Sequence, residues 1–209
     1  MTTTKSATVL GATGLVGKSL TQQLLNDERY HQITVLVRKP LSVSMFHDPL
    51  KKLVPVVIDF EQLQDYQGYF TVDHVYCCLG TTIKQAGSQK AFRRVDFEFV
   101  HVAAQLARAQ RASGFVWISS VGADAKSSNF YLRVKGELEN AILTMPQLKH
   151  AAAVRPSLLV GDREDVRTAE QLGIKVGKVI APLMLGPLKK YRPIEAADVA
   201  QQMIGLQHF

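Results

Sequence analysis

Short apolar segments alternate with helical segments along most of this 209-residue chain. Each apolar segment ends at a small, polar or charged residue, as strands buried on both faces of a sheet commonly do. Between several of them, apolar residues recur every three or four positions, which is the spacing of an amphipathic helix. The expected strands span residues 7–10, 33–37, 54–58, 74–79, 115–118 and 151–160, and the expected helices span 15–26, 89–111 and 131–143.

Buried strands joined by helical crossovers build a parallel sheet with helices on both of its faces. We therefore predict an α/β fold of the Rossmann type, a doubly wound parallel sheet in three layers, α/β/α. The length suits a single domain over residues 1–209, in which residues 161–209 form a small C-terminal helical portion, a lid or substrate segment. In such a fold, ligands bind beyond the carboxyl ends of the strands.

Composition narrows the kind of protein. With 46% hydrophobic and 21% charged residues, the chain has enough apolar surface to fold and is not a disordered sequence. Its two cysteines are neighbours, Cys77 and Cys78, so a disulfide framework is excluded. Free thiols, the lack of an apolar leader and the lack of an apolar run long enough to span a bilayer together predict a soluble, cytoplasmic protein.

The net charge of +7 raises the question of an anionic partner. Nucleic-acid binders usually concentrate basic residues on one element, beside aromatic side chains. Here the basic residues are scattered, with short pairs at 51–52, 93–94 and 189–190. We therefore expect a phosphorylated small-molecule ligand and no nucleic-acid partner.

Three glycines follow the first expected strand at intervals of three, at Gly11, Gly14 and Gly17. In a dinucleotide-binding loop, the first glycine allows a tight turn and the second lets the backbone approach a pyrophosphate. The third lets the following helix pack closely, and that helix directs its unpaired N–H groups at the phosphates. The position of the motif between a strand and a helix favours dinucleotide binding.

A second motif overlaps the first. Ala12, Gly17, Lys18 and Ser19 have the spacing of a phosphate-binding loop, in which Lys18 would reach the terminal phosphates and Ser19 would hold magnesium. Asp59, at the end of another expected strand, would then be the second magnesium ligand. This nucleotidase interpretation lacks the motif's first glycine and gives the two earlier glycines of the loop no role.

Arg38 and Lys39 follow the second expected strand, where an acidic residue binds the ribose 2′-hydroxyl of NAD. A guanidinium binds a phosphate through two parallel hydrogen bonds, so an arginine at this position suits the 2′-phosphate of NADP. Lys39 adds a second positive charge. The sequence therefore predicts NADP(H) as the cofactor.

Tyr131 and Lys135 are four residues apart on an expected helix, so their side chains lie on one face of it. A lysine cation near a phenol favours the phenolate form, which can exchange a proton with a carbonyl or alcohol oxygen during hydride transfer. Ser119 and Ser120 end the preceding strand, and a serine hydroxyl there would hold the same oxygen. The arrangement predicts hydride transfer on a small carbonyl or alcohol.

Six segments share a pattern with a known group of proteins: GATGLVG at 11–17, VRK at 37–39, CCLGTT at 77–82, AFRRVD at 91–96, SSVGADAKSSNFYLRVKGE at 119–137 and RPSLLVGDR at 155–163. With them the chain resembles the short-chain dehydrogenase/reductase superfamily, in its atypical branch. Within that branch it is similar to the Tat-interacting-protein-type oxidoreductases and their bacterial NAD(P)H-binding, epimerase-like relatives. The resemblance covers Gly11 to about Arg163.

The resemblance implies roles for particular residues. Tyr131 would be the catalytic acid/base, and Lys135 its partner and a ligand of the nicotinamide ribose. Ser120 would hold the substrate oxygen, with Ser119 as the alternative. The implied cofactor contacts are Gly11, Thr13, Gly14, Leu15 and Val16 with the pyrophosphate, Arg38 and Lys39 with the 2′-phosphate, Asp59 with adenine, Leu79, Gly80 and Thr81 on the adenosine side, and Pro156 near the nicotinamide.

Two positions depart from the pattern of this superfamily. Asp96 stands where many members have an asparagine that supports a proton-relay water, and Ser157 stands where a glycine usually follows the arginine–proline pair. The first departure places the usual proton relay in doubt, while neither forbids hydride transfer.

Two classes of function fit these residues. One is an NADP(H)-dependent oxidoreductase with a small-molecule substrate. The other is an NADP(H)-binding regulator that senses the redox state of the cofactor and binds a protein partner without turnover. An apolar stretch at 179–185, between lysines, has four interpretations: a core helix, a substrate lid, a partner surface or a membrane-contacting segment.

Overall fold

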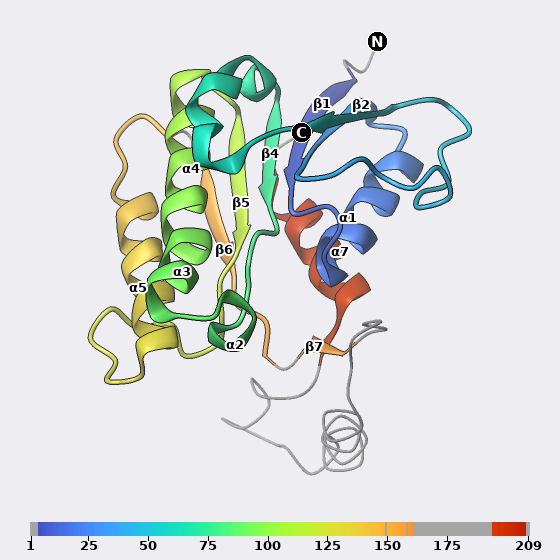
Figure 1. Ribbon diagram of the computed structural model, residues 1–209. Coiled ribbons are helices and arrows are strands. Elements are labelled where there is room, and N and C mark those ends of the chain that lie inside the picture. Colours follow the sequence, from blue (N-terminus) through green and yellow to red (C-terminus); the bar gives the residue numbers. More distant parts are fainter. Residues whose placement is uncertain (1–3, 149, 158, 161–193, 208–209) are drawn as a thin grey trace.

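A single parallel sheet forms the centre of the computed structural model, which describes residues 4–148, 150–157, 159–160 and 194–207 (Figure 1). Its six strands have the order β3-β2-β1-β4-β5-β6. They are β1 (Lys5–Leu10), β2 (Tyr30–Val37), β3 (Leu53–Val57), β4 (His74–Cys77), β5 (Gly114–Ile118) and β6 (Ala151–Val154). The order reverses between β1 and β4, which is where ligands bind in doubly wound sheets. The predicted Rossmann-type fold is confirmed.

Helices cover both faces of this sheet (Figure 1). α1 (Leu15–Asn26) and α7 (Ala196–Gly205) lie on one face and pack against each other, while α4 (Val100–Ala109) and α5 (Phe130–Leu143) lie on the other. The shorter helical segments are η1 (Phe60–Phe70), α2 (Ile83–Ala86), α3 (Gln89–Arg93) and η2 (Arg94–Phe99). The arrangement has the three predicted layers, with helices on either side of the strands.

The core lies in two apolar layers, one on each face of the sheet. Side chains of successive strand residues point to opposite faces, so Tyr76 packs toward α1 and α7, whereas Cys77 packs toward α4 and α5. Leu24 of α1 and Met203 of α7 belong to the first layer, and Trp117 of β5 belongs to the second. All of these side chains are buried. The packed core on both faces therefore fixes the positions of the strand ends at the carboxyl edge of the sheet.

α7 belongs to the chain segment that we assigned to the C-terminal portion, residues 161–209. Its Val199, Ala200 and Met203 are buried in the same layer as Leu20 and Leu24 of α1. Residues 161–193, which include the apolar stretch at 179–185, lie outside the described residues. The described part of the C-terminal portion therefore contributes to the core of the domain.

Side chains cap three of the helices near the carboxyl edge of the sheet. Thr82, Ser88 and Asn129 each accept a hydrogen bond from the backbone N–H three residues later, at the starts of α2, α3 and α5. Such a cap satisfies one of the N–H groups that a helix leaves unpaired at its start. The cap at Asn129 fixes the start of α5 at Phe130, so that Tyr131 lies in its first turn.

The helix predicted over residues 89–111 is built from three segments: α3, η2 and α4. The middle one, η2, has π-helical hydrogen bonding, which widens the helix locally and occurs frequently at functional sites. Asp96 lies in η2 and is buried. A pattern of apolar residues repeating every three or four positions does not distinguish such a turn from an ordinary α-helix.

The strand predicted over residues 151–160 ends at Val154. Pro156 has no N–H to continue the ladder, so the chain leaves the sheet before it. Farther along, β7 (Leu159–Val160) pairs in parallel with β8 (Ile194–Glu195) in a separate two-stranded sheet. Pro156 and Ser157 thus lie just beyond the carboxyl end of β6, beside the end of β5.

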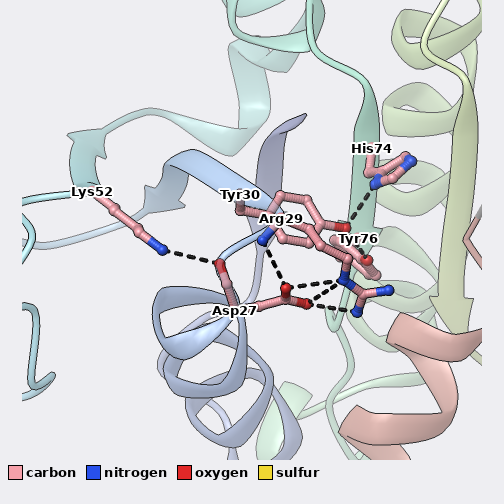
Figure 2. A network of polar contacts seen from close by, with 6 residues as sticks. All are labelled: Asp27, Arg29, Tyr30, Lys52, His74 and Tyr76. Atoms are coloured by element: carbon pink, nitrogen blue, oxygen red, sulfur yellow. Dashed lines mark hydrogen bonds and ion pairs between the residues drawn. The ribbon is translucent and has the colours of Figure 1, made fainter. Parts of the chain in front are cut away.

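A buried polar network ties β2 and β4 together at the opposite, amino-terminal edge of the sheet (Figure 2). The hydroxyl of Tyr30 lies 2.6 Å from Nδ1 of His74 and 2.8 Å from the hydroxyl of Tyr76. Burial raises the pKa values of Tyr30 and Tyr76 far above those of exposed tyrosines, so both phenols stay neutral. Nearby, Asp27 binds the Arg29 side chain, and the Lys52 ammonium donates to the Asp27 carbonyl.

Candidate functional site

The glycine loop between β1 and α1 lies in close contact with the end of β4. Leu10 pairs with Cys77, so Gly11 follows its strand directly beside Cys78. Gly11 has a positive φ of 80°, and a Cβ there would lie 2.6 Å from the carbonyl carbon of Cys78. The loop thus requires glycine at this position both for its backbone conformation and for the close approach of the neighbouring strand.

Gly17 performs the packing role expected of the third glycine. A Cβ on Gly17 would overlap the carbonyl oxygen of Gly11 and approach the Cα of Ala12 within 3.0 Å. At the start of the helix, Gly14 is the cap residue, and among the described residues no side-chain cap hydrogen bond forms there. The loop therefore leads into an uncapped helix start, the arrangement that binds a pyrophosphate in dinucleotide-binding folds.

Replacing Gly17 by alanine should destabilise the protein by about 1–3 kcal/mol, because the new Cβ meets backbone atoms that only a shift of α1 can relieve. The matched control is Gly205→Ala, since Gly205 also lies in a helix and has no atom within 4 Å of an added Cβ. Urea unfolding of both variants measures the two changes in the free energy of unfolding. Equal, small changes would contradict the close packing of α1 against the loop.

Three cavities open at the carboxyl edge of the sheet, with volumes of about 600, 530 and 290 Å³. The first lies over the glycine loop and shares Arg38 and Phe60 with the second. It shares Leu79, Gly80 and Thr81 with the third. Because neighbouring cavities share lining residues, they lie side by side across the point where the strand order reverses, and we refer to the three together as the crevice.

Most of the predicted cofactor residues line this crevice. Gly11, Thr13, Gly14, Arg38, Leu79, Gly80 and Thr81 line the first cavity, Arg38 and Asp59 the second, and Gly14, Leu15, Val16 and Pro156 the third. Lys39 is exposed and is not among the lining residues of these three cavities. Lys18 and Ser19, which the nucleotidase interpretation requires, are also absent from these linings.

The third cavity brings together the residues predicted to be catalytic. Tyr131 and Lys135 line it from α5, and Ser119 and Ser120 line it from the end of β5. The Ser119 N–H donates to the carbonyl of Val154 at 2.7 Å, which holds the end of β5 beside β6. The ring of Tyr131 lies 5.6 Å from that of Phe92 between centroids, so α3 supports one side of the tyrosine.

The two serines differ in their hydrogen bonding. Ser120 donates a long hydrogen bond of 3.4 Å to the carbonyl of Val121. The Oγ atom of Ser119 is buried and has no hydrogen-bond partner within the described part of the chain. Both side chains line the same cavity, where Ser120 is half-buried and Ser119 is buried.

Lys135 forms a buried ion pair with Asp96. Its Nζ lies 2.7 Å from Oδ1 of Asp96, and only 3% of the lysine side chain and 1% of the aspartate side chain are exposed. The other carboxylate oxygen accepts a hydrogen bond of 2.9 Å from the backbone N–H of Thr81. Burial raises the pKa of Asp96, while the Lys135 ammonium and the Thr81 N–H oppose that rise.

The second cavity contains residues that the sequence pattern did not indicate. Phe60 and Phe99 line it and have ring centroids 5.8 Å apart. Arg94 also lines it and is held by Glu61 and Glu98. Asp59 caps η1 by accepting the Glu61 N–H at 2.9 Å. The two rings are tilted by 44° to each other and give this cavity an apolar wall beside Arg38.

The parallel sheet, the glycine loop and the crevice at the strand reversal together define a dinucleotide-binding protein of the Rossmann class. The chain belongs to the NAD(P)H-binding family, whose model matches residues 11–176. The superfamily resemblance stated from the sequence is thereby confirmed, and the nucleotidase interpretation of the loop is set aside.

Relatives with known names match most of the chain. Rat Protein HTATIP2 is 36% identical over 172 residues, which cover 82% of this chain and 69% of the relative. Protein FMP52-1, mitochondrial, from Scheffersomyces stipitis is 32% identical over 202 residues, covering 94% of this chain and 85% of the relative. Protein FMP52, mitochondrial, from Candida albicans is 29% identical, over 95% of this chain and 86% of the relative.

Solved structures share the fold at low sequence identity. MoeE5 in complex with UDP-glucose and NAD matches with a TM-score of 0.70 at 15% identity, over 95% of this chain and 70% of that one. The Bordetella bronchiseptica enzyme WbmH in complex with NAD+ matches with a TM-score of 0.70 at 13% identity, over 97% of this chain and 72% of that one. These similarities concern the fold.

The predicted cytoplasmic location is contradicted by the yeast relatives, which are named as mitochondrial proteins and point away from a purely cytoplasmic location. The prediction rested on the free thiols Cys77 and Cys78 and on the lack of an apolar leader and of a membrane-spanning run. Free thiols are typical of reducing compartments in general and do not separate one of them from another. Among the described residues, no helix is long and apolar enough to cross a membrane.

Proposed function

We propose that this chain is an NADP(H)-dependent oxidoreductase that acts on a small carbonyl compound or alcohol. The supporting observation is that Tyr131, Lys135 and two serines line one cavity, which shares lining residues with the cavity over the glycine loop. A dinucleotide extended along this crevice would place its nicotinamide end beside the tyrosine. The family match and the NAD complexes of the structural neighbours support a nicotinamide cofactor.

The choice of NADP(H) over NAD(H) is part of the proposal and is based on Arg38. This side chain is exposed, lines both cavities at the adenosine end and forms no ion pair with another described residue. An unpaired guanidinium at the end of β2 is suited to bind a 2′-phosphate through two hydrogen bonds. Asp59 would face the adenine, and Phe60 with Phe99 would pack against its ring.

At the other end of the crevice, the proposal assigns a proton-transfer role to Tyr131. Its phenol would exchange a proton with the substrate oxygen, which Ser119 or Ser120 would hold by a hydrogen bond. Lys135 would bind the nicotinamide ribose and set the charge near the phenol. When bound, the reduced nicotinamide supplies the hydride, with its electron pair, to the carbonyl carbon.

A screen of small aldehydes and ketones, with NADPH oxidation followed by absorbance, tests this function directly. Turnover of a carbonyl compound is the expected result. If no compound is turned over while NADPH binds tightly and alters binding to a protein partner, the protein is an NADP(H)-binding regulator instead.

A further inference from the structure

The ion pair between Asp96 and Lys135 joins three segments that line the third cavity. Lys135 comes from α5 and Asp96 from η2, while Thr81, which donates its N–H to Asp96, comes from the loop after β4. This loop also lines the first cavity. A buried carboxylate with a lysine and a backbone donor is well satisfied, so its charge is held in a fixed position.

The position of Asp96 changes the charge that reaches Tyr131. An unaccompanied lysine ammonium one helical turn away would favour the phenolate. Here the Asp96 carboxylate lies 2.7 Å from that ammonium, and the two opposite charges form a pair with no net charge. The field of the pair at the phenol is therefore much weaker than that of the lysine alone.

Other titratable groups around the pair do not replace this effect. On β4, burial raises the pKa of Cys77 to about 12, so that thiol stays neutral. The remaining charged side chains on α5 and facing it are Glu137 paired with Arg93, Glu139 paired with Arg155, and Arg133 bound to the carbonyls of Ser127 and Ser128. Among the described residues, Asp96 is the carboxylate in contact with Lys135.

We infer that Asp96 is a positioning residue that offsets the Lys135 charge at the Tyr131 hydroxyl, so that the phenol holds its proton more tightly than it would beside the lysine alone. A protonated phenol is the group that the proposed function requires as proton donor when a carbonyl compound is reduced. This inference rests on the proposed function and concerns its proton donor.

In the proposed reduction, the proton and the electron pair that the carbonyl group receives each have a source. The O–H bond of Tyr131 breaks, and the proton bonds to the carbonyl oxygen as the carbonyl carbon is reduced. The electron pair for that carbon comes from the hydride of the reduced nicotinamide. The phenolate left on Tyr131 then takes a proton from water, which restores the donor for the next substrate.

Tyrosinate absorbance across a pH series tests the inference without any substrate. The chain has 6 tyrosines, so the signal of Tyr131 is obtained by subtracting the titration of Tyr131→Phe from that of the unmodified protein. Asp96→Asn, titrated in the same way with and without Tyr131→Phe, removes the charge and keeps an oxygen that can accept the Thr81 N–H. The midpoint for Tyr131 should fall by about one to two pH units in Asp96→Asn.

A second comparison covers the case in which Asp96→Asn does not fold. Asp96→Asn combined with Lys135→Met removes both charges of the pair, and its Tyr131 midpoint should stay within about half a pH unit of that in the unmodified protein. A rise of one unit or more in the double variant, or an unmoved midpoint in folded Asp96→Asn, overturns the inference.

The substrate screen tests the proposed function, and the titration tests the role of Asp96, so either can be refuted without the other. A protein that turns over no carbonyl compound refutes the proposed function, while the Tyr131 midpoint still reports whether Asp96 offsets Lys135. Conversely, turnover of carbonyl compounds with an unmoved midpoint in Asp96→Asn supports the function and refutes the role of Asp96.

Discussion

Tyr131→Phe should lower carbonyl reduction by about 10²–10⁴-fold, which is the usual contribution of a positioned proton donor. The substitution removes one oxygen atom and keeps the ring, so the packing against Phe92 persists. NADPH affinity, measured by fluorescence titration, should be unchanged because the proposed cofactor contacts do not involve the phenol. The rate is measured with whichever aldehyde or ketone the screen identifies.

Tyr69→Phe is the matched control for this substitution. Tyr69 is 40% exposed, lies in η1 and does not line the three cavities of the crevice, so its loss of a hydroxyl should leave the rate within about twofold of that of the unmodified protein. A Tyr131→Phe variant as active as the Tyr69→Phe control would show that Tyr131 is not the proton donor.

Arg38→Ala should weaken NADPH binding by roughly ten- to a hundredfold and leave NADH binding nearly unchanged. The reason is the loss of a charge-assisted hydrogen bond to the 2′-phosphate, which is worth about 1.5–3 kcal/mol. Fluorescence titration of both cofactors measures the preference. Before substitution, NADPH should bind more tightly than NADH, and equal affinities would refute the assignment of the cofactor.

Two further variants separate a specific phosphate contact from the general effect of positive charge. Lys39→Ala removes the neighbouring cation, which does not line the cavities, and should weaken NADPH binding less than Arg38→Ala does. Arg108→Ala removes a cation that lines a separate cavity with Arg111 and should leave the preference for NADPH in place. An equal loss in all three variants would indicate that only net charge matters.

Local patterns predicted the architecture well. The helix expected over residues 15–26 has the same bounds as α1, and each expected strand up to residue 118 overlaps an observed one. These elements are apolar runs or amphipathic repeats, whose periodicity is set by the backbone geometry itself. The glycine loop was also predictable, because a strand, three spaced glycines and a helix occur together in the sequence.

Contacts between distant segments were not predictable in the same way. The pair of Asp96 and Lys135 depends on how η2 and α5 pack, and the second cavity combines Phe60 with Phe99 from separate helical segments. Neither pair has a local signature, since an aspartate or a phenylalanine in a helix is compatible with many environments. The sequence singled out Asp96 only as a departure from the superfamily pattern.

Two further predictions from the sequence, the role of Lys39 and the location within the cell, differ from what the structure and the relatives show. The sequence assigned both Arg38 and Lys39 to the 2′-phosphate, but of the two only Arg38 lines the crevice; both lie in the bend after β2, whose conformation the sequence pattern does not specify. The location within the cell was beyond the reach of such reasoning, since a targeting signal is read by a receptor and has no bearing on packing.

The packing of α7 against α1 has a consequence for how the protein is made. α1 is synthesised well before α7, and its Leu20 and Leu24 are buried together with Val199 and Met203 of that later helix. On the ribosome, the apolar side of α1 therefore stays uncovered until α7 has emerged. Because this contact joins distant parts of the sequence, its formation is slow and leaves the nascent chain exposed to aggregation. The newly made protein should accordingly depend on chaperones that bind apolar segments.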